Sequence, residues 1–149
     1  MKKFCLFLSL IFPVVALFSQ SHENLRLVGI FSMKGDDLRT VVTSKNSLVK
    51  MSDKEIVEIT KIINERIEEY LTLRERVNKS IPVDVNGRPT GKADPQLIRA
   101  RDAVVYDVST SIYEYLGEKK YKQLDKTLMN ENERKNSEGL KNAMKNKKK

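Results

Sequence analysis

One stretch of the chain carries residue types that could handle a nucleotide. The segment Val85–Asp94, VNGRPTGKAD, contains two glycines, and a lysine directly follows the second. A phosphate-binding loop needs G-x-x-x-x-G-K-[ST], in which the backbone wraps the phosphates, the lysine reaches the outer ones and the hydroxyl holds Mg²⁺. The first glycine of that spacing would fall on Asn86, and the residue after Lys92 is Ala93, so the metal-binding hydroxyl is missing. The stretch therefore does not predict a phosphate site.

The same stretch also lacks the spacing of a calcium loop. Counted from Asp84 as the first ligand, the sixth position is Pro89, where glycine is needed. The twelfth position is Pro95, where a bidentate glutamate belongs. An Asn-Gly dipeptide among prolines is typical of a turn, and proline disfavours a helix interior. We therefore predict a connector here.

The first 21 residues resemble a cleavable export signal. Two lysines precede an apolar run from Phe4 to Phe18 that Ser9 interrupts, and small and polar residues follow. This is the three-part pattern of a secretory signal peptide. The run is short for a membrane span, which needs about 20 residues, so an uncleaved anchor is the weaker alternative. We expect cleavage after Ser19 or Ser21 and a periplasmic or secreted bacterial protein.

Removal of residues 1–21 would limit the chemistry that remains. Cys5 is the sole cysteine, so the mature chain would have no thiol and no disulfide, which suits a bacterial envelope. His22 is the sole histidine and would lie at the new terminus, where it cannot serve a catalytic triad or an imidazole metal site. Carboxylates such as Glu65 and Glu69 are typical of a solvated helix face. We predict no enzyme, no cofactor and no metal. An enzyme that uses only carboxylates and lysines, for example on cell-wall glycans, is the remaining enzymatic alternative.

The basic character of the chain belongs to its C-terminus. The net charge is +8, and five lysines lie in the last nine residues. Without these and the two signal lysines, residues 22–140 carry a net charge of +1. A nucleic-acid-binding domain concentrates charge on a structured face, so we predict no nucleic acid as partner. The lysine tail could make weak contact with an anionic envelope surface.

The clearest element is a long helix that begins at Ser52. Ser52 and Glu55 have the spacing of a capping box. Apolar residues then recur every three or four positions and form one stripe along the helix. The stripe looks wider than one partner helix can cover, so we interpret part of it as a client-binding or dimer surface. Its candidate residues are Ile59, Ile63, Ile67 and Tyr70.

A second long helix begins at Asp94, the predicted N-cap, with Pro95 as its first residue. Apolar residues from position 104 to 112 also alternate with period two, as in a strand, but an apolar span of about 20 residues is too long for one strand. Tyr106 and Tyr113 share a face of this helix and are either packed or part of the same client-binding surface. Gly117 then interrupts the pattern, and a short helix follows.

The predicted fold class is all-α: a long helical hairpin plus a short C-terminal helix. The signal peptide (1–21) is followed by an irregular, loosely ordered N-terminal arm (22–50), whose apolar residues dock on the main body as strands or helices. The helical domain spans 51–130, and a basic, polar, disordered tail spans 131–149.

This layout resembles the Spy/CpxP group of small periplasmic helical proteins, which is marked by two copies of an L-T-x-x-Q motif at helix starts. The first copy would be MSDKE (51–55), with Ser52 for threonine and Glu55 for glutamine. The second would be LGEKK (116–120), in which Gly117 and Lys120 depart from the pattern. The resemblance implies a cradle-shaped dimer that acts as an ATP-independent chaperone or an envelope-stress adaptor.

Two interpretations of function follow from these observations. The first is an exported, homodimeric binding protein that holds protein partners or unfolded clients on an apolar helix face. The alternative is a structural or adhesion component of the cell envelope without chaperone activity. A small exported domain without disulfides has a modest core, and this is why we expect a homodimer.

Overall fold

The computed structural model describes residues 25–27, 29–32 and 36–146. These residues form a short 3-10 helix, η2 (Ile30–Ser32), and three α-helices: α1 (Asp36–Thr43), α2 (Asp53–Lys79) and α3 (Pro95–Asn146). The described part of the chain contains one isolated β-bridge, between Val83 and Pro89, and no longer strand. The all-α prediction is therefore confirmed, and the predicted signal peptide lies outside the described residues.

The start of α2 is the predicted capping box. The Ser52 backbone N–H donates to Glu55 Oε2 at 2.8 Å, and the Glu55 backbone N–H donates to the Ser52 hydroxyl at 3.3 Å. Both donors lack partners inside the helix, so this reciprocal pair satisfies them and begins the helix at Asp53. The helix ends at Lys79, where the Ser80 N–H still donates to the Arg76 carbonyl at 3.0 Å.

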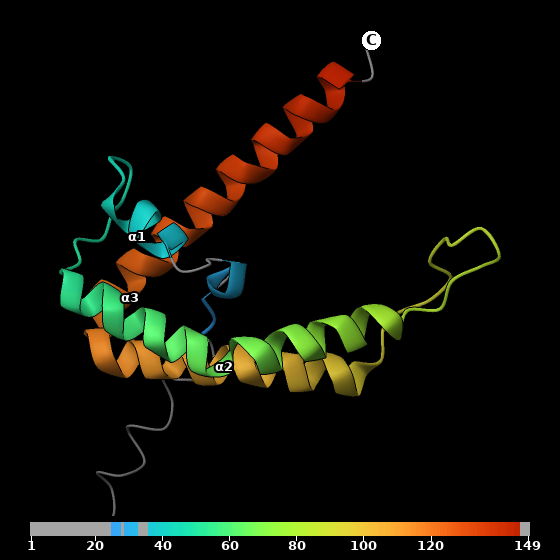
Figure 1. Ribbon diagram of the computed structural model, residues 1–149, viewed down its shortest axis with the longest axis horizontal. Helices are drawn as coiled ribbons and strands as arrows, with labels where there is room; N and C mark the ends of the chain where they lie inside the picture. Colours follow the sequence, from blue (N-terminus) through green and yellow to red (C-terminus); the bar gives the residue numbers. More distant parts are fainter. Residues whose placement is uncertain (1–24, 28, 33–35, 147–149) are drawn as a thin grey trace, which may run out of the picture.

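The connector between α2 and α3 is built around Asp84. The carboxylate of Asp84 accepts the backbone N–H groups of Asn86 and Arg88, both at 2.8 Å. The carbonyl of the same residue accepts the N–H of Gly87, whose φ of 75° is left-handed. The stretch is therefore a turn that returns the chain, as predicted, and it projects at one end of the molecule (Figure 1).

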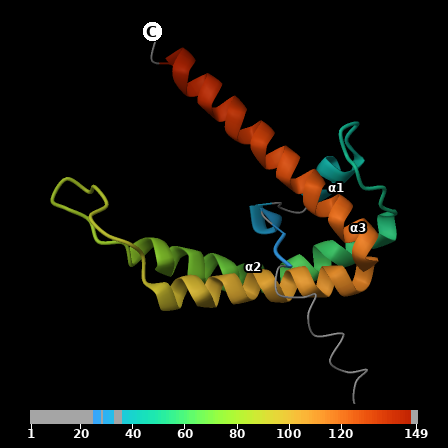
Figure 2. The ribbon, with the colours of Figure 1, turned by 180° about the vertical axis from the view of Figure 1, so that it is seen from behind.

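The start of α3 is also as predicted. Asp94 accepts the Gln96 N–H on its carboxylate at 2.8 Å and the Ile98 N–H on its carbonyl at 3.1 Å. The period-two alternative is wrong because α3 is helical through this region and buries Val104, Val108 and Ile112. In Figures 1 and 2 the first part of α3 runs beside α2 and returns along it, so the two helices form the predicted hairpin.

A bend at Gly117 divides α3 into a proximal half (95–116) and a distal half (118–146). Gly117 has φ 74° and ψ 164°, which is non-helical. The distal half leaves the hairpin at a sharp angle, so the molecule has two limbs that diverge from the bend (Figures 1 and 2). The sequence predicts this break, but it does not predict the length of the helix beyond it.

Residues 131–146 differ from the prediction of a disordered tail, because α3 continues to Asn146. Ion pairs along this part of the helix stabilise it in place of packed apolar side chains. Arg134 contacts Glu131 three residues earlier at 2.6 Å and Glu138 four residues later at 2.7 Å. Residues 147–149 of the predicted tail lie outside the described chain.

The described residues of the N-terminal arm are part of the core and include two short helices, so they are more ordered than predicted. They are helical in η2 and α1 and fill the space beside the bend (Figure 1). The Leu27 N–H donates to the buried Ser109 hydroxyl of α3 at 3.0 Å, and the Leu48 N–H donates to Thr127 at 3.1 Å. The predicted docking is thus confirmed. The buried residues of the N-terminal arm are Leu25, Leu27, Ile30, Phe31, Leu38, Val41, Val42 and Val49.

Candidate functional site

The predicted helix caps form a junction between helices. Glu55 Oε1 accepts a hydrogen bond from Lys120 Nζ, while its other oxygen caps α2. The bond from Lys120, followed by that from Ser52, lowers the pKa of Glu55 from 4.5 to about 2. The neighbouring Asp53 forms an ion pair with Arg39 of α1. The first turn of α2 therefore binds both α1 and the distal half of α3. Its role is structural.

The apolar stripe on α2 is mostly covered within the chain. Ile59 is fully buried and Ile63 is 2% exposed, and both belong to the core. Ile67 and Tyr70 are partly buried against the same core, and the ring of Tyr70 stacks on Phe31 of η2 at 4.2 Å between centroids. The prediction that this stripe is an open client or dimer surface is therefore corrected for Ile59 and Ile63, because α3 and the N-terminal arm pack against α2 and bury them.

The two tyrosines of the proximal half of α3 have different environments. Tyr113 is partly buried and meets Tyr121 of the distal half edge-to-face, with centroids 5.3 Å apart. This contact spans the bend, so packing is the role of Tyr113. Tyr106 is 38% exposed and does not belong to the core. The six candidate residues are therefore not brought together on one open surface.

Two ionisable groups with shifted pKa values lie on the distal half of α3: the buried Tyr121 and the half-buried Asp125. Burial raises the pKa of the Tyr121 hydroxyl to about 12, and burial also raises the pKa of Asp125. One oxygen of Asp125 is buried without a hydrogen bond. A perturbed carboxyl group serves catalysis only where a nucleophile or base faces the same cavity. Asp125 lines neither of the two hollows described below.

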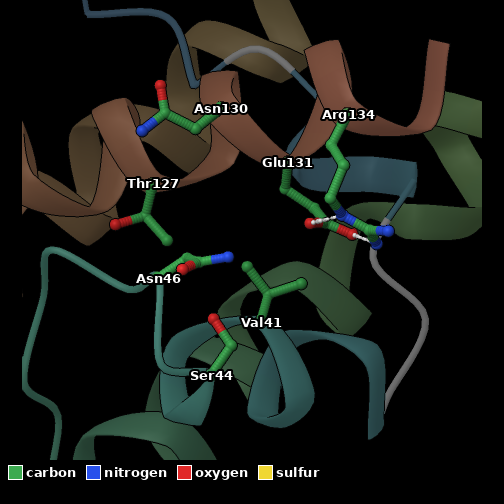
Figure 3. Close-up of a pocket in the computed structure, with 7 residues that line it drawn as sticks. All are labelled: Val41, Ser44, Asn46, Thr127, Asn130, Glu131 and Arg134. Carbon is green, nitrogen blue, oxygen red and sulfur yellow. Dashed lines mark hydrogen bonds and ion pairs between the residues drawn. The ribbon is translucent and has the colours of Figure 1, made fainter. Parts of the chain in front are cut away.

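A polar hollow of about 300 Å³ lies between the distal half of α3 and α1 with its following loop (Figure 3). Thr127, Asn130, Glu131 and Arg134 line it from α3, and Val41, Ser44 and Asn46 line it from the other side. The Arg134 guanidinium is paired with Glu131 and Glu138. Paired in this way, the one cation of the hollow is not available for an anionic ligand.

A second hollow of about 290 Å³ lies beside η2. Its rim carries an ion-pair group in which Asp102 bridges Arg26, at 3.0 Å, and Arg101, at 2.8 Å. Phe31 and Tyr70 close its apolar side with their stacked rings. The Arg26–Asp102 ion pair holds the N-terminal arm on α3, and the Phe31–Tyr70 stack holds it on α2, so the hollow lies where the arm meets both helices.

The part of the chain that the structure describes contains no candidate metal cluster and no candidate membrane-spanning helix. Within it, no group of three His, Cys, Asp or Glu side chains is placed to hold a metal ion. None of the described helices is long and apolar enough to cross a membrane.

Four exposed large apolar side chains of the described residues lie at the ends of the two limbs, while others, Val57 among them, lie singly along the helices. At the hairpin end, defined by Val83 and Val85 of the connector, Val85 is fully exposed and Val83 is 59% exposed. At the helix end, defined by Leu140 and Met144 of α3, the exposed fractions are 62% and 65%. The sequence analysis did not select these residues. Two sequence features could have identified them: two valines in a polar turn, and a Leu-Met pair spaced i, i+4 in a lysine-rich segment.

The fold and this surface define a two-limbed all-α protein with apolar groups at both extremities. Comparisons of the chain with protein-family models, with curated proteins and with solved structures found no match.

Proposed function

We propose that this protein is an exported helical binding protein of the bacterial envelope, chaperone-like or an envelope-stress adaptor, which holds unfolded or partly folded polypeptides. The observation that carries the proposal is the position of the exposed apolar side chains at the hairpin end and the helix end. Exposed apolar side chains that lie together can form a protein-binding surface, and each limb end carries two of them. Held on two separate limbs, they can contact an extended polypeptide at more than one point.

Local structure at the two motif copies supports the resemblance to the Spy/CpxP group. The first copy, 51–55, forms the cap at the start of α2, and the second, 116–120, lies where α3 resumes after its bend. The last residues of the two copies, Glu55 and Lys120, bond to each other. Lys120, which stands in place of the motif's glutamine, therefore has a hydrogen-bond partner in this chain.

The surface for clients differs from the one expected from sequence. Because Ile59 and Ile63 are buried, a client would meet Val83 and Val85 at one extremity and Leu140 and Met144 at the other. The lysines that accompany the helix end add positive charge, which favours acidic clients or an anionic envelope surface. The buried residues Ile59 and Ile63 would not contribute to a homodimer interface in this conformation.

A client-binding assay with a matched control tests the proposal. The protein, purified after export, is added at stoichiometric amounts to an unfolded model substrate, and aggregation is followed by light scattering. We expect the parent protein to slow aggregation and a Val85→Asp/Leu140→Asp variant to be several-fold weaker. Val57→Asp introduces one negative charge, half of that in the double variant, at a valine that is 61% exposed on α2, away from both ends, and should behave like the parent.

Each result has a defined meaning. If the parent protein does not slow aggregation but stays bound to envelope fractions, the chaperone-like function is wrong and the structural or adhesion role replaces it. If Val57→Asp is as weak as the double variant, the limb ends do not carry the binding. Circular dichroism of each variant checks that its helices are intact.

A further inference from the structure

The bend in α3 depends on one residue. Gly117 combines φ 74° with ψ 164°, a conformation that is essentially restricted to glycine. Helix-forming residues flank it on both sides, and Glu118 already pairs with Lys122 in the first turn of the distal half. A Cβ at position 117 would meet no atom within 4 Å, so packing does not exclude a side chain there. The backbone conformation alone requires glycine.

The distal half is held by a compact set of contacts beyond the bend. Tyr121 is 5% exposed, and Leu124 and Leu128 are fully buried in the core that α1 and α2 complete. Lys120 bonds to Glu55 of α2, and Thr127 accepts the Leu48 N–H at 3.1 Å. Because these partners lie outside the distal half, a second copy of the chain can provide the same surface.

We propose that Gly117 is a hinge for arm exchange: α3 can straighten, and its distal half then packs on α1 and α2 of a second copy while receiving that copy's distal half in return. A straight α3 of 52 residues would span about 78 Å. In one chain alone this would expose Leu124 and Leu128. In the exchanged pair every contact of the distal half is made again, but between chains, which is the arrangement of a two-fold domain-swapped dimer.

The features around the hinge favour a second copy as the occupant of this surface. The surface of α1 and α2 that an exchanged distal half would occupy fits that half in shape, charge and hydrogen bonds, because the same surface binds the distal half within one chain. The two straight helices would pass each other near Gly117, where the absence of a side chain permits close approach. The exchanged dimer has two hairpin ends and two helix ends. The proposal does not rest on the client-binding function, because it concerns only contacts inside the fold.

Two glycine substitutions in the same helix test the hinge. Gly117→Ala adds a methyl group that strains the bent backbone and favours a straight helix. Gly139→Ala adds the same group within the helical part of the distal half, in open space and without a positive φ. By light scattering at tens of micromolar, we expect Gly117→Ala to have twice the mass of one chain with unchanged helical content. We expect Gly139→Ala to keep the mass of the parent. A folded, monomeric Gly117→Ala protein overturns the proposal.

A charge exchange tests the same idea with Gly117 retained, in case Gly117→Ala does not fold. Glu55→Lys and Lys120→Glu each place like charges at the junction between α2 and the distal half. In an exchanged dimer of one chain of each kind, both junctions regain opposite charges. Refolded together, the two variants should give dimers that contain one of each, which neither variant forms alone. If the mixture stays as monomeric as the separate variants, arm exchange is wrong.

Discussion

Replacing Leu124 by alanine should strongly destabilise the protein, whereas the same change at Leu140 should not. Both residues lie on the distal half of α3, so the change in helix propensity is the same and cancels in the comparison. Leu124 is fully buried in the core, and Leu140 is 62% exposed. Removing a buried leucine side chain costs about 2–5 kcal/mol, because its transfer free energy is lost and a cavity remains. An exposed site should change by no more than about 0.5 kcal/mol.

Urea unfolding followed by circular dichroism measures the difference. A domain of this size loses about 1–3 kcal/mol of unfolding free energy per molar urea, so a cost of about 3 kcal/mol shifts the midpoint by about 1–3 M for Leu124→Ala. The midpoint of Leu140→Ala should stay close to that of the parent. Equal and small shifts would refute the reasoning, because they would mean that the distal half is not docked on α1 and α2.

Two further predictions concern the junction at the start of α2. Ser52→Ala removes the cap and should lower the unfolding free energy by about 1 kcal/mol in the same urea assay; an unchanged midpoint would mean that the capping box contributes no stability. Lys120→Met should remove a pH-dependent stabilisation. The pKa of Glu55 is about 2 in the folded protein, below its ordinary value of 4.5, so the stabilisation is complete above pH 4.5 and is lost as pH falls toward 2. The difference between parent and Lys120→Met in urea midpoint should therefore be largest near neutral pH and shrink below pH 4. A difference that is constant over this range contradicts the assigned role of Lys120.

Local signals predicted the helix boundaries well. The Ser52–Glu55 box, the Asp94-Pro95 start and the Gly117 break all occur as expected, because each depends on groups within four residues along the chain. The connector also follows from local chemistry, since Asp84 bonds to backbone N–H groups two and four residues further on. Such interactions need no tertiary partner, and this is why the sequence alone could indicate them.

The predicted binding site failed for the opposite reason. Ile59, Ile63 and Tyr70 form an amphipathic stripe, and such a stripe does not reveal whether a client, a second copy or the chain's own N-terminal arm covers it. The arm had no clear period because η2 and α1 are short, and their burial depends on contacts with α3 more than 70 residues away. The helix beyond residue 131 was not predicted because it has no apolar periodicity. Ion pairs along its surface stabilise it instead.

Sequence patterns alone were enough to predict an all-α chain with two long helices, their capped starts, a turn between them and a break at Gly117. These features depend on backbone conformation and on neighbours along the chain. The tertiary structure alone decided which apolar faces are closed. The packing of Phe31 on Tyr70 and of the distal half on α1 and α2 buried the expected surface, and it left Val85 and Leu140 exposed at the two extremities. Burial is a property of pairs of elements distant in sequence, so the residues available to a partner become known only when those elements meet.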